Sequence, residues 1–351
     1  PFPEIYSTNS TSFRTNGLSA ARQQPDRKRQ NAPQKRFRPG KGRRRSVRRF
    51  FSVFSSLCLR EFIPLPRKFV SEEMKIFTSV KELRAELETA EQSGIGFVPT
   101  MGALHAGHRS LVERARRENA TVVVSVFVNP TQFNDKNDLR HYPRTPEADA
   151  RLLERAGADF VLMPSVEEIY PEPDGRQFDF GQIDKVMEGA TRPGHFNGVA
   201  QVVSRLFDIV RPARAYFGEK DFQQIAVVKA MVDQLSLPVE IVECEIVRGE
   251  DGLALSSRNA LLDAEHRAAA PQIYAALRAA AEKSQELAPE ALKAWVTAEV
   301  ERNPLLKVIY YQSVDARTMQ EVAAWSDAER IQGCIAVQAG DIRLIDNIRI
   351  R

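Results

Sequence analysis

The sequence predicts an α/β protein: a Rossmann-like parallel sheet with helices on both faces, followed by a smaller α+β C-terminal domain. Three observations carry this prediction. From Met74 onward, short apolar runs alternate with segments of helical periodicity, as a parallel sheet with crossover helices requires. The apolar runs are nearly continuous, which is typical of strands buried on both faces. After Asn259 the pattern changes to an Ala-rich helical stretch and three further strand-like runs.

The elements of the parallel sheet follow in chain order. A strand at 75–78 and a helix at 80–87 open the pattern. Further strands are expected at 96–98, 121–128, 160–163, 215–217 and 239–247, with helices between them at 105–118, 146–156, 197–210 and 222–235. In the last helix, the spacing of Ile225, Val228, Met231 and Val232 predicts a face that packs against the core.

The C-terminal part has its own pattern. Asp263 is a candidate N-cap for a helix that runs to about Lys283, and a second helix is expected at 289–302. Strands are expected at 308–312, 334–337 and 341–345. We place a domain boundary near Val247, which separates a Rossmann-like domain (74–246) from a C-terminal lid domain (247–351).

Residues 1–73 differ from the rest in charge. They hold 17 Lys and Arg against 5 Asp and Glu, whereas the remaining residues carry a net charge of −8. The sequence pI of about 9.0 therefore describes this leader. Its composition predicts disorder. Three interpretations stay open: a basic arm that binds nucleic acid, a transit peptide, and a non-native extension upstream of a true start at Met74. We favour the last, and expect the chain from Met74 to fold by itself.

Composition also excludes several classes of protein. The acidic body argues against nucleic acid as a partner. No apolar run reaches the roughly 18 residues of a membrane span. Cys58, Cys244 and Cys334 are widely spaced and odd in number, which favours reduced thiols and a cytoplasmic location.

The most informative segment is 99–108, Pro-Thr-Met-Gly-Ala-Leu-His-Ala-Gly-His. It lies between an expected strand and an expected helix, and it places His105 and His108 on one face of the first helical turn. The free N–H groups and the positive dipole end of a helix N-terminus bind anions, and Gly107 lets a phosphate approach the backbone. Two imidazoles directed at such a site indicate nucleotide chemistry.

Four other segments supply candidate site residues. The Gly-Glu-Lys-Asp turn at 218–221 follows an expected strand, where parallel sheets bind ligands, and Lys220 suits a phosphate. Gln224 lies one helical turn further on. Two serines and Arg258 in the loop 251–259 suit a phosphate clamp. Gln132, after the strand at 121–128, can orient a small polar substrate. For Arg192 and His195, a turn and a ligand contact are equally good interpretations.

Seven segments together resemble the pantothenate synthetase (pantoate–β-alanine ligase) family, within the nucleotidyltransferases that carry a His-x-Gly-His box. The resemblance runs from about Met74 to Asp346. The segments are 99–108, 127–130 (Phe-Val-Asn-Pro), 142–145 (Tyr-Pro-Arg-Thr), 188–196 (Glu-Gly-Ala-Thr-Arg-Pro-Gly-His-Phe), 217–224 (Phe-Gly-Glu-Lys-Asp-Phe-Gln-Gln), 251–259 (Asp-Gly-Leu-Ala-Leu-Ser-Ser-Arg-Asn) and 343–347 (Arg-Leu-Ile-Asp-Asn).

The resemblance implies a two-step ligation of small molecules. ATP and (R)-pantoate give a bound pantoyl adenylate and pyrophosphate, and β-alanine then releases pantothenate and AMP. It also implies that ATP is a substrate accompanied by Mg²⁺, that no cofactor is tightly bound, and that the chain forms a homodimer without nucleic-acid or membrane partners. Asp149 is a candidate for the surroundings of the metal.

The resemblance also implies roles for single residues. His108 is the proton donor, with His105 and Lys220 as further catalytic residues. Gln132 and Gln224 hold pantoate, and Gln132 also lies near β-alanine. The ATP-binding residues are Met101, Gly102, Ala103, Leu104, His105, Ala106, Gly107, His108, Gly218, Glu219, Lys220, Asp221, Val247, Leu255, Ser256, Ser257 and Arg258.

Two other functions stay open at this point. A related nucleotidyltransferase would stop at a stable nucleotide product, and it would not need the pair Gln132 and Gln224. A non-enzymatic binding module is suggested solely by the basic leader, whose binding to nucleic acid would be lost with salt.

Overall fold

The computed structural model describes residues 73–89, 94–134 and 136–351, with the backbone alone for Lys136. Our predictions for the basic leader, and for Cys58 within it, lie outside the described residues, which include just Glu73 of that segment. In the described part of the chain, no helix combines the length and the apolar character needed to cross a bilayer.

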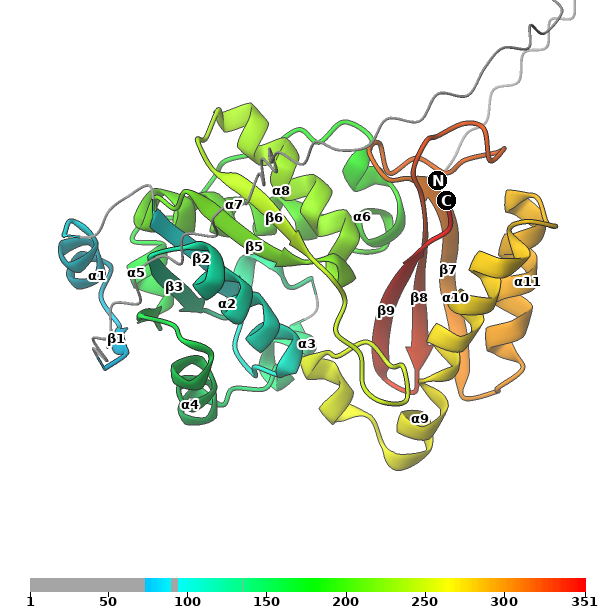
Figure 1. Ribbon diagram of the computed structural model, residues 1–351, viewed down its shortest axis with the longest axis horizontal. Coiled ribbons are helices and arrows are strands. Elements are labelled where there is room, and N and C mark those ends of the chain that lie inside the picture. The colour runs from blue at the N-terminus through cyan, green and yellow to red at the C-terminus, as the bar shows by residue number, and fades with distance from the viewer. Residues whose placement is uncertain (1–72, 90–93, 135) are drawn as a thin grey trace, which may run out of the picture. The chain divides into compact units, whose positions relative to one another are not determined.

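A six-stranded parallel sheet forms the first part of the fold (Figure 1). Every neighbouring pair of its strands runs parallel, in the order β1-β4-β3-β2-β5-β6. The strands are β1 (Lys75–Phe77), β2 (Ile95–Thr100), β3 (Thr121–Val126), β4 (Phe160–Leu162), β5 (Arg214–Gly218) and β6 (Glu240–Cys244). The predicted α/β class with a parallel sheet is confirmed.

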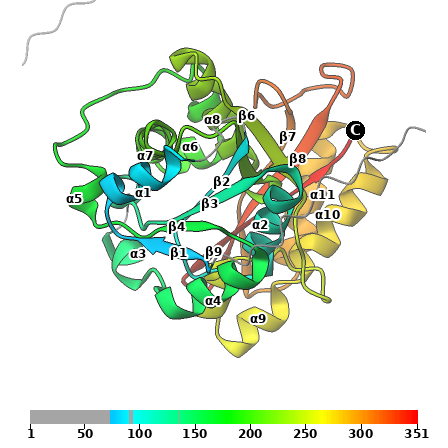
Figure 2. The ribbon, with the colours of Figure 1, turned by 60° about the vertical axis from the view of Figure 1, so that its left-hand side comes forward.

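Helices cover both faces of this sheet (Figure 2). The main helices are α1 (Val80–Leu87), α2 (Ala106–Glu118), α4 (Pro146–Ala156), α7 (His195–Val210) and α8 (Phe222–Leu235). Successive strand residues point to opposite faces. Phe97 of β2 accordingly belongs to the apolar cluster of α1, α7 and α8, and Val98 to the cluster of α2 and α4. Burial on both faces explains why the strands are so uniformly apolar in sequence.

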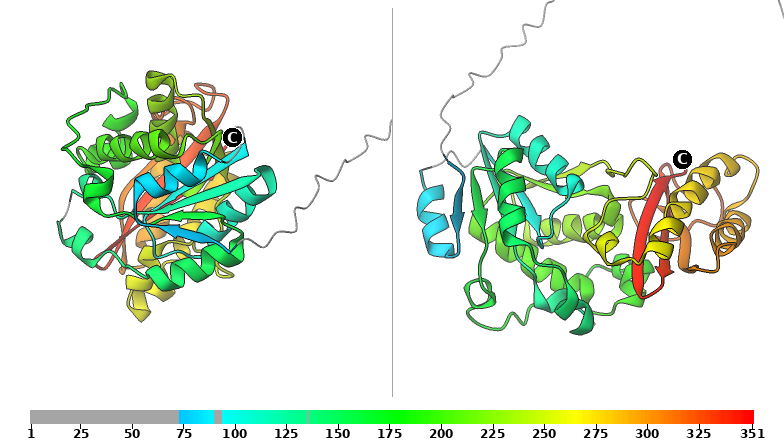
Figure 3. Two further views of the ribbon diagram at one scale, coloured as in Figure 1. Left: turned by 90° about the vertical axis from the view of Figure 1, so that its left-hand side faces the viewer. Right: turned by 90° about the horizontal axis from the view of Figure 1, so that it is seen from below.

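A second, antiparallel sheet forms the C-terminal part (Figure 3). Its strands are β7 (Leu306–Asp315), β8 (Ile331–Ala339) and β9 (Ile342–Arg349), in that order. Side chains of α10 (Gln272–Lys283) and α11 (Pro289–Glu301) share an apolar cluster with these strands. A smaller cluster joins Val314 and Cys334 of this sheet to Met187 and Phe222 of the first part.

Among the predicted elements, one strand ends well before its expected bound and one helix is interrupted. The strand expected at 239–247 stops at Cys244, because its partner residue Gly218 is the last residue of β5 and no further backbone pairs with it. The helix expected from Asp263 to Lys283 is interrupted, with α9 spanning Ala264–Ala269. Pro271 carries no N–H to continue the helix, and α10 begins directly after it.

Several short elements escaped the sequence analysis, because three to six residues are too few to show a periodicity. They are η2 (Pro130–Gln132), α3 (Lys136–His141), α5 (Val166–Ile169), η3 (Ile183–Lys185), α6 (Met187–Thr191), η4 (Glu219–Asp221) and η5 (Ser257–Leu261).

The packing of α7 against η2 positions one wall of the cleft described below and depends on Gly198. A Cβ atom added there would lie 2.5 Å from the Thr131 carbonyl oxygen and 2.8 Å from Cα of Gln132. Those neighbours are backbone atoms, so they cannot rotate away as a flexible side chain would.

We expect Gly198→Ala to lower the free energy of unfolding by about 1–2 kcal/mol. Overpacking typically costs about 1–3 kcal/mol, which exceeds the gain of about 1 kcal/mol in helix propensity. Urea denaturation measures the difference. The matched control is Gly175→Ala, since a Cβ atom at Gly175 meets nothing within 4 Å. Equal stability of the wild type and the Gly198 variant would contradict the prediction.

Candidate active site

A cleft lies at the carboxyl end of the parallel sheet, between β2 and β5. The strand order reverses at this point, which is where open parallel sheets bind ligands. Residues from three of the predicted segments, 99–108, 217–224 and 251–259, line the cleft together with Gln132 and Val247. They are Met101, His105, Gly107, His108, Gln132, Gly218, Lys220, Asp221, Gln224, Val247, Leu255, Ser256, Ser257 and Arg258.

The turn from β2 into α2 is built around the buried carboxylate of Asp149, on α4. Its Oδ2 accepts a hydrogen bond from the Ala103 N–H at 3.0 Å, and its Oδ1 accepts one from the Leu104 N–H at 2.8 Å. The Thr145 hydroxyl donates to Oδ1 as well. Gly102 and Ala103 have positive φ angles of 86° and 48°, which turn successive N–H groups toward the carboxylate. Both carboxylate oxygens of Asp149 are thus used within the turn, and its place in the surroundings of a metal ion stays a prediction.

The two histidines cap the N-terminus of α2. His105 is the N-cap residue, and its Nδ1 accepts a hydrogen bond from the Gly107 N–H at 3.1 Å. The arrangement is reciprocal, because Nδ1 of His108 accepts a hydrogen bond from the His105 N–H at 3.3 Å. The ring centroids lie 4.1 Å apart. The predicted pair on one face of the helix therefore also satisfies two backbone donors that a helix start leaves free.

Both imidazoles are neutral near pH 7. Burial is the largest cause for each, and it lowers the pKa of His105 to about 4 and that of His108 to about 3. The positive charge of Lys220 lowers both values further. Because each Nδ1 accepts a hydrogen bond, the proton of each neutral ring sits on Nε2. Each ring that lines the cleft can therefore donate one hydrogen bond to an anion.

Lys220 lies on the opposite side of the switch point, in η4 directly after β5. Its side chain is 18% exposed, and its Nζ lies 3.6 Å from Oδ1 of Asp221. That carboxylate is 47% exposed, so the ion pair is weak. The ammonium group therefore stays available to a more highly charged anion in the cleft.

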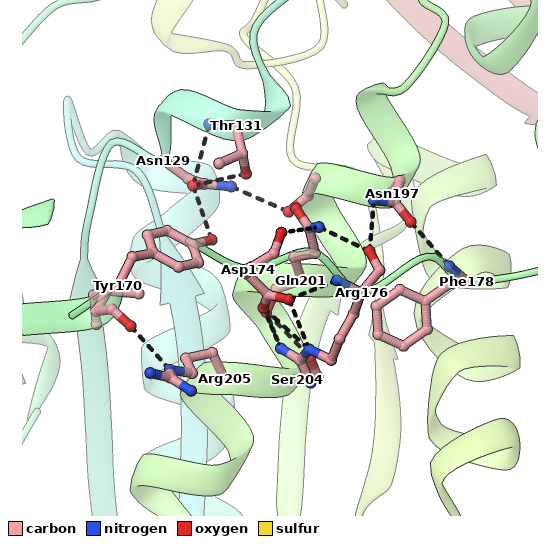
Figure 4. A network of polar contacts seen from close by, with 12 residues as sticks. Asn129, Thr131, Tyr170, Asp174, Arg176, Phe178, Asn197, Gln201, Ser204 and Arg205 are labelled. Atoms are coloured by element: carbon pink, nitrogen blue, oxygen red, sulfur yellow. Dashed lines mark hydrogen bonds and ion pairs between the residues drawn. The ribbon is translucent and has the colours of Figure 1, made fainter. Parts of the chain in front are cut away.

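Gln132 is buried in the wall that α7 and η2 form. Its Oε1 accepts a hydrogen bond from Asn129 Nδ2 at 3.2 Å, and its Nε2 lies 2.9 Å from Sδ of Met101. Asn129 is itself held by the hydroxyl groups of Tyr170 and Thr131 (Figure 4). The same view shows the next layer, where Asn197 and Gln201 of α7 hold the segment 174–178.

Arg192 and His195, whose role stayed open in the sequence, lie behind Gln132. His195 is buried, and its Nδ1 lies 2.8 Å from the carbonyl oxygen of Gln132. Arg192 Nη1 lies 3.1 Å from the other ring nitrogen. Burial, followed by the charge of Arg192, lowers the pKa of His195 to about 4, so the ring is neutral and donates from Nδ1 to Gln132. Both residues border a smaller adjoining cavity, with Lys220 and Gln224.

The loop that contains Ser256, Ser257 and Arg258 lines the same cleft as the histidines. Arg258 forms an ion pair with Asp138 of α3 at 2.9 Å, and Ser257 Oγ lies 3.3 Å from the Tyr142 hydroxyl group. Both partners belong to the segment between η2 and α4. The loop therefore bridges the two sides of the cleft with a few polar contacts.

Some residues in the predicted ATP set do not line the cleft. Gly102, Ala103 and Leu104 form the turn around Asp149, and Ala106 lies exposed on the first turn of α2. Glu219 lies 3.7 Å from Arg330. Their roles toward a nucleotide stay predictions.

Other lining residues were not among our candidates. They include Tyr142, Phe127, Glu245 and Ile246. An apolar face of α7 adds Val199, Val202, Val203 and Leu206. Their spacing of three and four residues was visible in the sequence, but it also fits a helix that simply packs on a sheet.

The chain matches the family model described as pantoate-beta-alanine ligase over residues 75–349. Proteins named pantothenate synthetase are similar to it. That of Porphyromonas gingivalis is 56% identical over 278 residues, 79% of this chain and 99% of the relative. That of Bacteroides fragilis is 54% identical over 281 residues, with the same coverage.

Solved structures are similar as well. Pantothenate synthetase from Thermus thermophilus superposes with a TM-score of 0.75 and 46% identity, covering 79% of this chain and 99% of that one. A pantoate-beta-alanine ligase from Francisella tularensis, described as complexed with beta-gamma ATP and beta-alanine, gives a TM-score of 0.68 and 35% identity. It covers 79% of this chain and 98% of that one.

The buried neutral histidines predict a loss of stability in mild acid. Between pH 6.5 and 4 the unfolded chain binds protons at His105, His108 and His195, and the folded chain does not. The free energy of unfolding therefore falls as the pH drops through this range. In His108→Asn, Oδ1 of the amide can replace Nδ1 as an acceptor. We expect this variant to lose roughly 1–2 kcal/mol less than the wild type between pH 7 and 5.

Urea denaturation at the two pH values measures this difference, with the exposed His141→Asn as the control. Equal pH dependence in wild type and His108→Asn would show that burial does not keep His108 neutral.

Proposed function

The chain belongs to the pantoate-beta-alanine ligase family and is a ligase that joins pantoate to β-alanine, and we propose that it does so in this cleft through a pantoyl adenylate. One observation supports this location of the reaction: the two neutral imidazoles and Lys220 line the same cleft at the switch point of the sheet. The alternative, a nucleotidyltransferase that stops at a stable nucleotide product, is not favoured.

The proposed reaction has two steps. In the first, a carboxylate oxygen of pantoate attacks the α-phosphorus of ATP, an O–P bond forms, and the bond to the bridging oxygen breaks to release pyrophosphate. In the second, the amine nitrogen of β-alanine attacks the acyl carbon. The new C–N bond forms, the C–O bond to AMP breaks, and the amine loses a proton.

The first step concentrates negative charge on phosphoryl oxygens, and the cleft supplies groups that stabilise such charge. These are the Nε2–H donors of His105 and His108, the ammonium group of Lys220 and the N-terminus of α2. Each ring needs one N–H group for this role. The capping hydrogen bonds at Nδ1 leave the proton of each neutral ring on Nε2, so each ring donates a hydrogen bond without carrying a positive charge.

Pantoate fits the wall between α7 and η2. The amide nitrogen of Gln132 faces the Met101 sulfur, which is a weak acceptor, so a substrate oxygen can replace it. Gln224 lines the cleft from α8. The apolar face of α7 suits the dimethyl carbon of pantoate. Gln132 also borders the position where β-alanine must attack, since the acyl carbon belongs to the molecule that it holds.

Mg²⁺ would accompany ATP in this proposal. In the part of the chain that the structure describes, no group of three His, Cys, Asp or Glu side chains could hold a metal ion. Mg²⁺ at nucleotide sites is commonly held by phosphates and waters with one or two carboxylates, and Asp221 beside Lys220 fits that role. Bound there, the ion would add positive charge near the phosphates.

Two further expectations concern assembly and location. We propose that the chain is a homodimer and that it works in the cytoplasm on small molecules. The two described cysteines, Cys244 and Cys334, are free and buried, which agrees with reduced thiols.

We also propose that residues 247–351 act as a lid, hinged near Val247. The adenylate is prone to hydrolysis, so its site must exclude water. The loop with Ser256–Arg258 already touches Asp138 and Tyr142 across the cleft.

Hydrogen exchange of the full chain tests the lid. A non-hydrolysable ATP analogue with pantoate should slow amide exchange in 253–261 and 136–142, because closure shields both sides of the bridge. Protection confined to 99–108 and 218–224 would contradict the lid and leave the nucleotide site intact.

The assignment of roles predicts different losses for different residues. Lys220→Ala and His108→Ala should each slow pantoate-dependent exchange of pyrophosphate into ATP by about 10²–10³, because each removes a group that stabilises phosphoryl charge. Gln132→Ala should chiefly raise the KM for pantoate and β-alanine, and leave ATP binding close to that of the wild type.

Exchange rates, single-turnover amide formation and ATP affinity measure these effects. Lys229→Ala, an exposed lysine on the same helix as Gln224, is the matched control. Normal exchange in both the lysine and the histidine variants, with amide formation alone slowed, would overturn the assignment.

A further inference from the structure

The segment 343–347, Arg-Leu-Ile-Asp-Asn, has no role in the reaction as described so far. It lies on β9, and its last two residues are almost completely buried, with Asp346 5% and Asn347 3% exposed. Polar side chains at that depth require hydrogen-bond partners. Asn347 finds partners on the turn that carries Lys220, and Asp346 finds them on Arg248, so neither residue depends on its own sheet alone.

Asn347 reaches from β9 to the turn that carries Lys220. Its Nδ2 donates to the carbonyl oxygen of Glu219 at 2.9 Å and to that of Lys220 at 3.0 Å. Its Oδ1 accepts a hydrogen bond from Gln332 Nε2 on the neighbouring strand at 2.7 Å. The amide nitrogen of Asn347 thus donates to two successive backbone carbonyl groups of η4. The hydrogen bond from Gln332 to the amide oxygen fixes the orientation of the amide.

Asp346 fixes the backbone beside it. The Arg248 guanidinium forms two parallel hydrogen bonds with the Asp346 carboxylate, at 2.6 Å and 2.9 Å. The same guanidinium stacks over the ring of Tyr274 at 3.6 Å and also donates to the carbonyl oxygen of Asn347. A two-point ion pair in a buried setting holds both partners in one geometry.

The turn to which Asn347 is hydrogen-bonded, η4, has few other contacts that fix its position. η4 is three residues long, and no side chain caps its N-terminus. Gly218, which precedes it, is the last residue of β5 and pairs with Cys244, and a Cβ added there would meet nothing within 4 Å, so no side chain packs against the start of the turn at that point. The position of Lys220 therefore depends on contacts from outside the turn.

We propose that Asn347 is a positioning residue for Lys220: its amide sets the turn η4 from β9, so that the ammonium group meets the phosphoryl oxygens in the adenylation step. The inference rests on the proposed role of Lys220. It makes the C-terminal sheet a part of the catalytic machinery, because the lysine comes from one sheet and the group that places it comes from the other.

The test is a double-mutant cycle in the full chain. Asn347→Leu should slow pantoate-dependent exchange of pyrophosphate into ATP by about tenfold to a hundredfold, as a misplaced catalytic group does. In the Lys220→Ala background the same change should cost less than about twofold, because the group it positions is already absent. Gln338→Leu is the matched control and should leave exchange unchanged, because this half-buried amide on β8 bonds the carbonyl oxygen of Gly340 in the turn that follows.

A second variant covers the case in which Asn347→Leu does not fold. Gln332→Met removes the donor that orients the Asn347 amide, and Oε1 of Gln332 is itself buried without a hydrogen-bond partner, so the fold should tolerate the change. We expect exchange to slow about threefold to tenfold, again solely when Lys220 is present.

The possible outcomes separate the inference from the function on which it rests. Equal losses with and without Lys220, or exchange within about twofold of wild type in folded Asn347→Leu, would overturn the positioning role. Wild-type exchange in Lys220→Ala alone would instead overturn the role of the lysine.

Discussion

The site depends first on the carboxylate of Asp149. An ionised group at 2% exposure is costly unless hydrogen bonds replace its water. The Ala103 and Leu104 N–H groups and the Thr145 hydroxyl group do so. In return the carboxylate holds two adjacent residues at positive φ, one of them alanine, a conformation that an L-residue rarely adopts. The direction in which α2 starts, and with it the histidine pair, follows from this turn.

Burial then decides the charge of the groups in the cleft. The same loss of water that lowers the pKa values of His105 and His108 leaves both rings uncharged beside Lys220, the cation whose charge lowers both values further. Two neutral donors and one cation suit a reaction that concentrates negative charge on phosphoryl oxygens as it proceeds. Three cations at that point would bind the ground state strongly as well, and binding that is equal in both states does not lower the barrier.

The sequence predicted the regular elements and most of the cleft for identifiable reasons. Buried parallel strands and amphipathic helices leave periodic patterns, and the carboxyl ends of such strands meet at one edge, which places Lys220 near His108. The role of Asp149 could not be predicted, because a carboxylate that binds backbone N–H groups looks like any helix residue in sequence. Asn347 was equally hidden, since its partners are carbonyl oxygens of a turn that lies 127 and 128 positions earlier. The short elements α3 and η5 show no periodicity in the sequence. The ion pair between Arg258 and Asp138, which joins them, could therefore not be predicted either.

The apolar face of α7 has a consequence for how this enzyme could change its substrate. Val199, Val203 and Leu206 belong to the main core and to the cleft wall at once. A mutation that widens the pocket for a bulkier acid therefore also removes buried core. Truncation of a leucine costs about 2–5 kcal/mol, a large part of the roughly 5–15 kcal/mol that holds a typical domain folded. A change of specificity along this wall therefore requires stabilising substitutions elsewhere in the protein first. Without them, selection for a new substrate is expected to change the polar residues Gln132 and Gln224 instead.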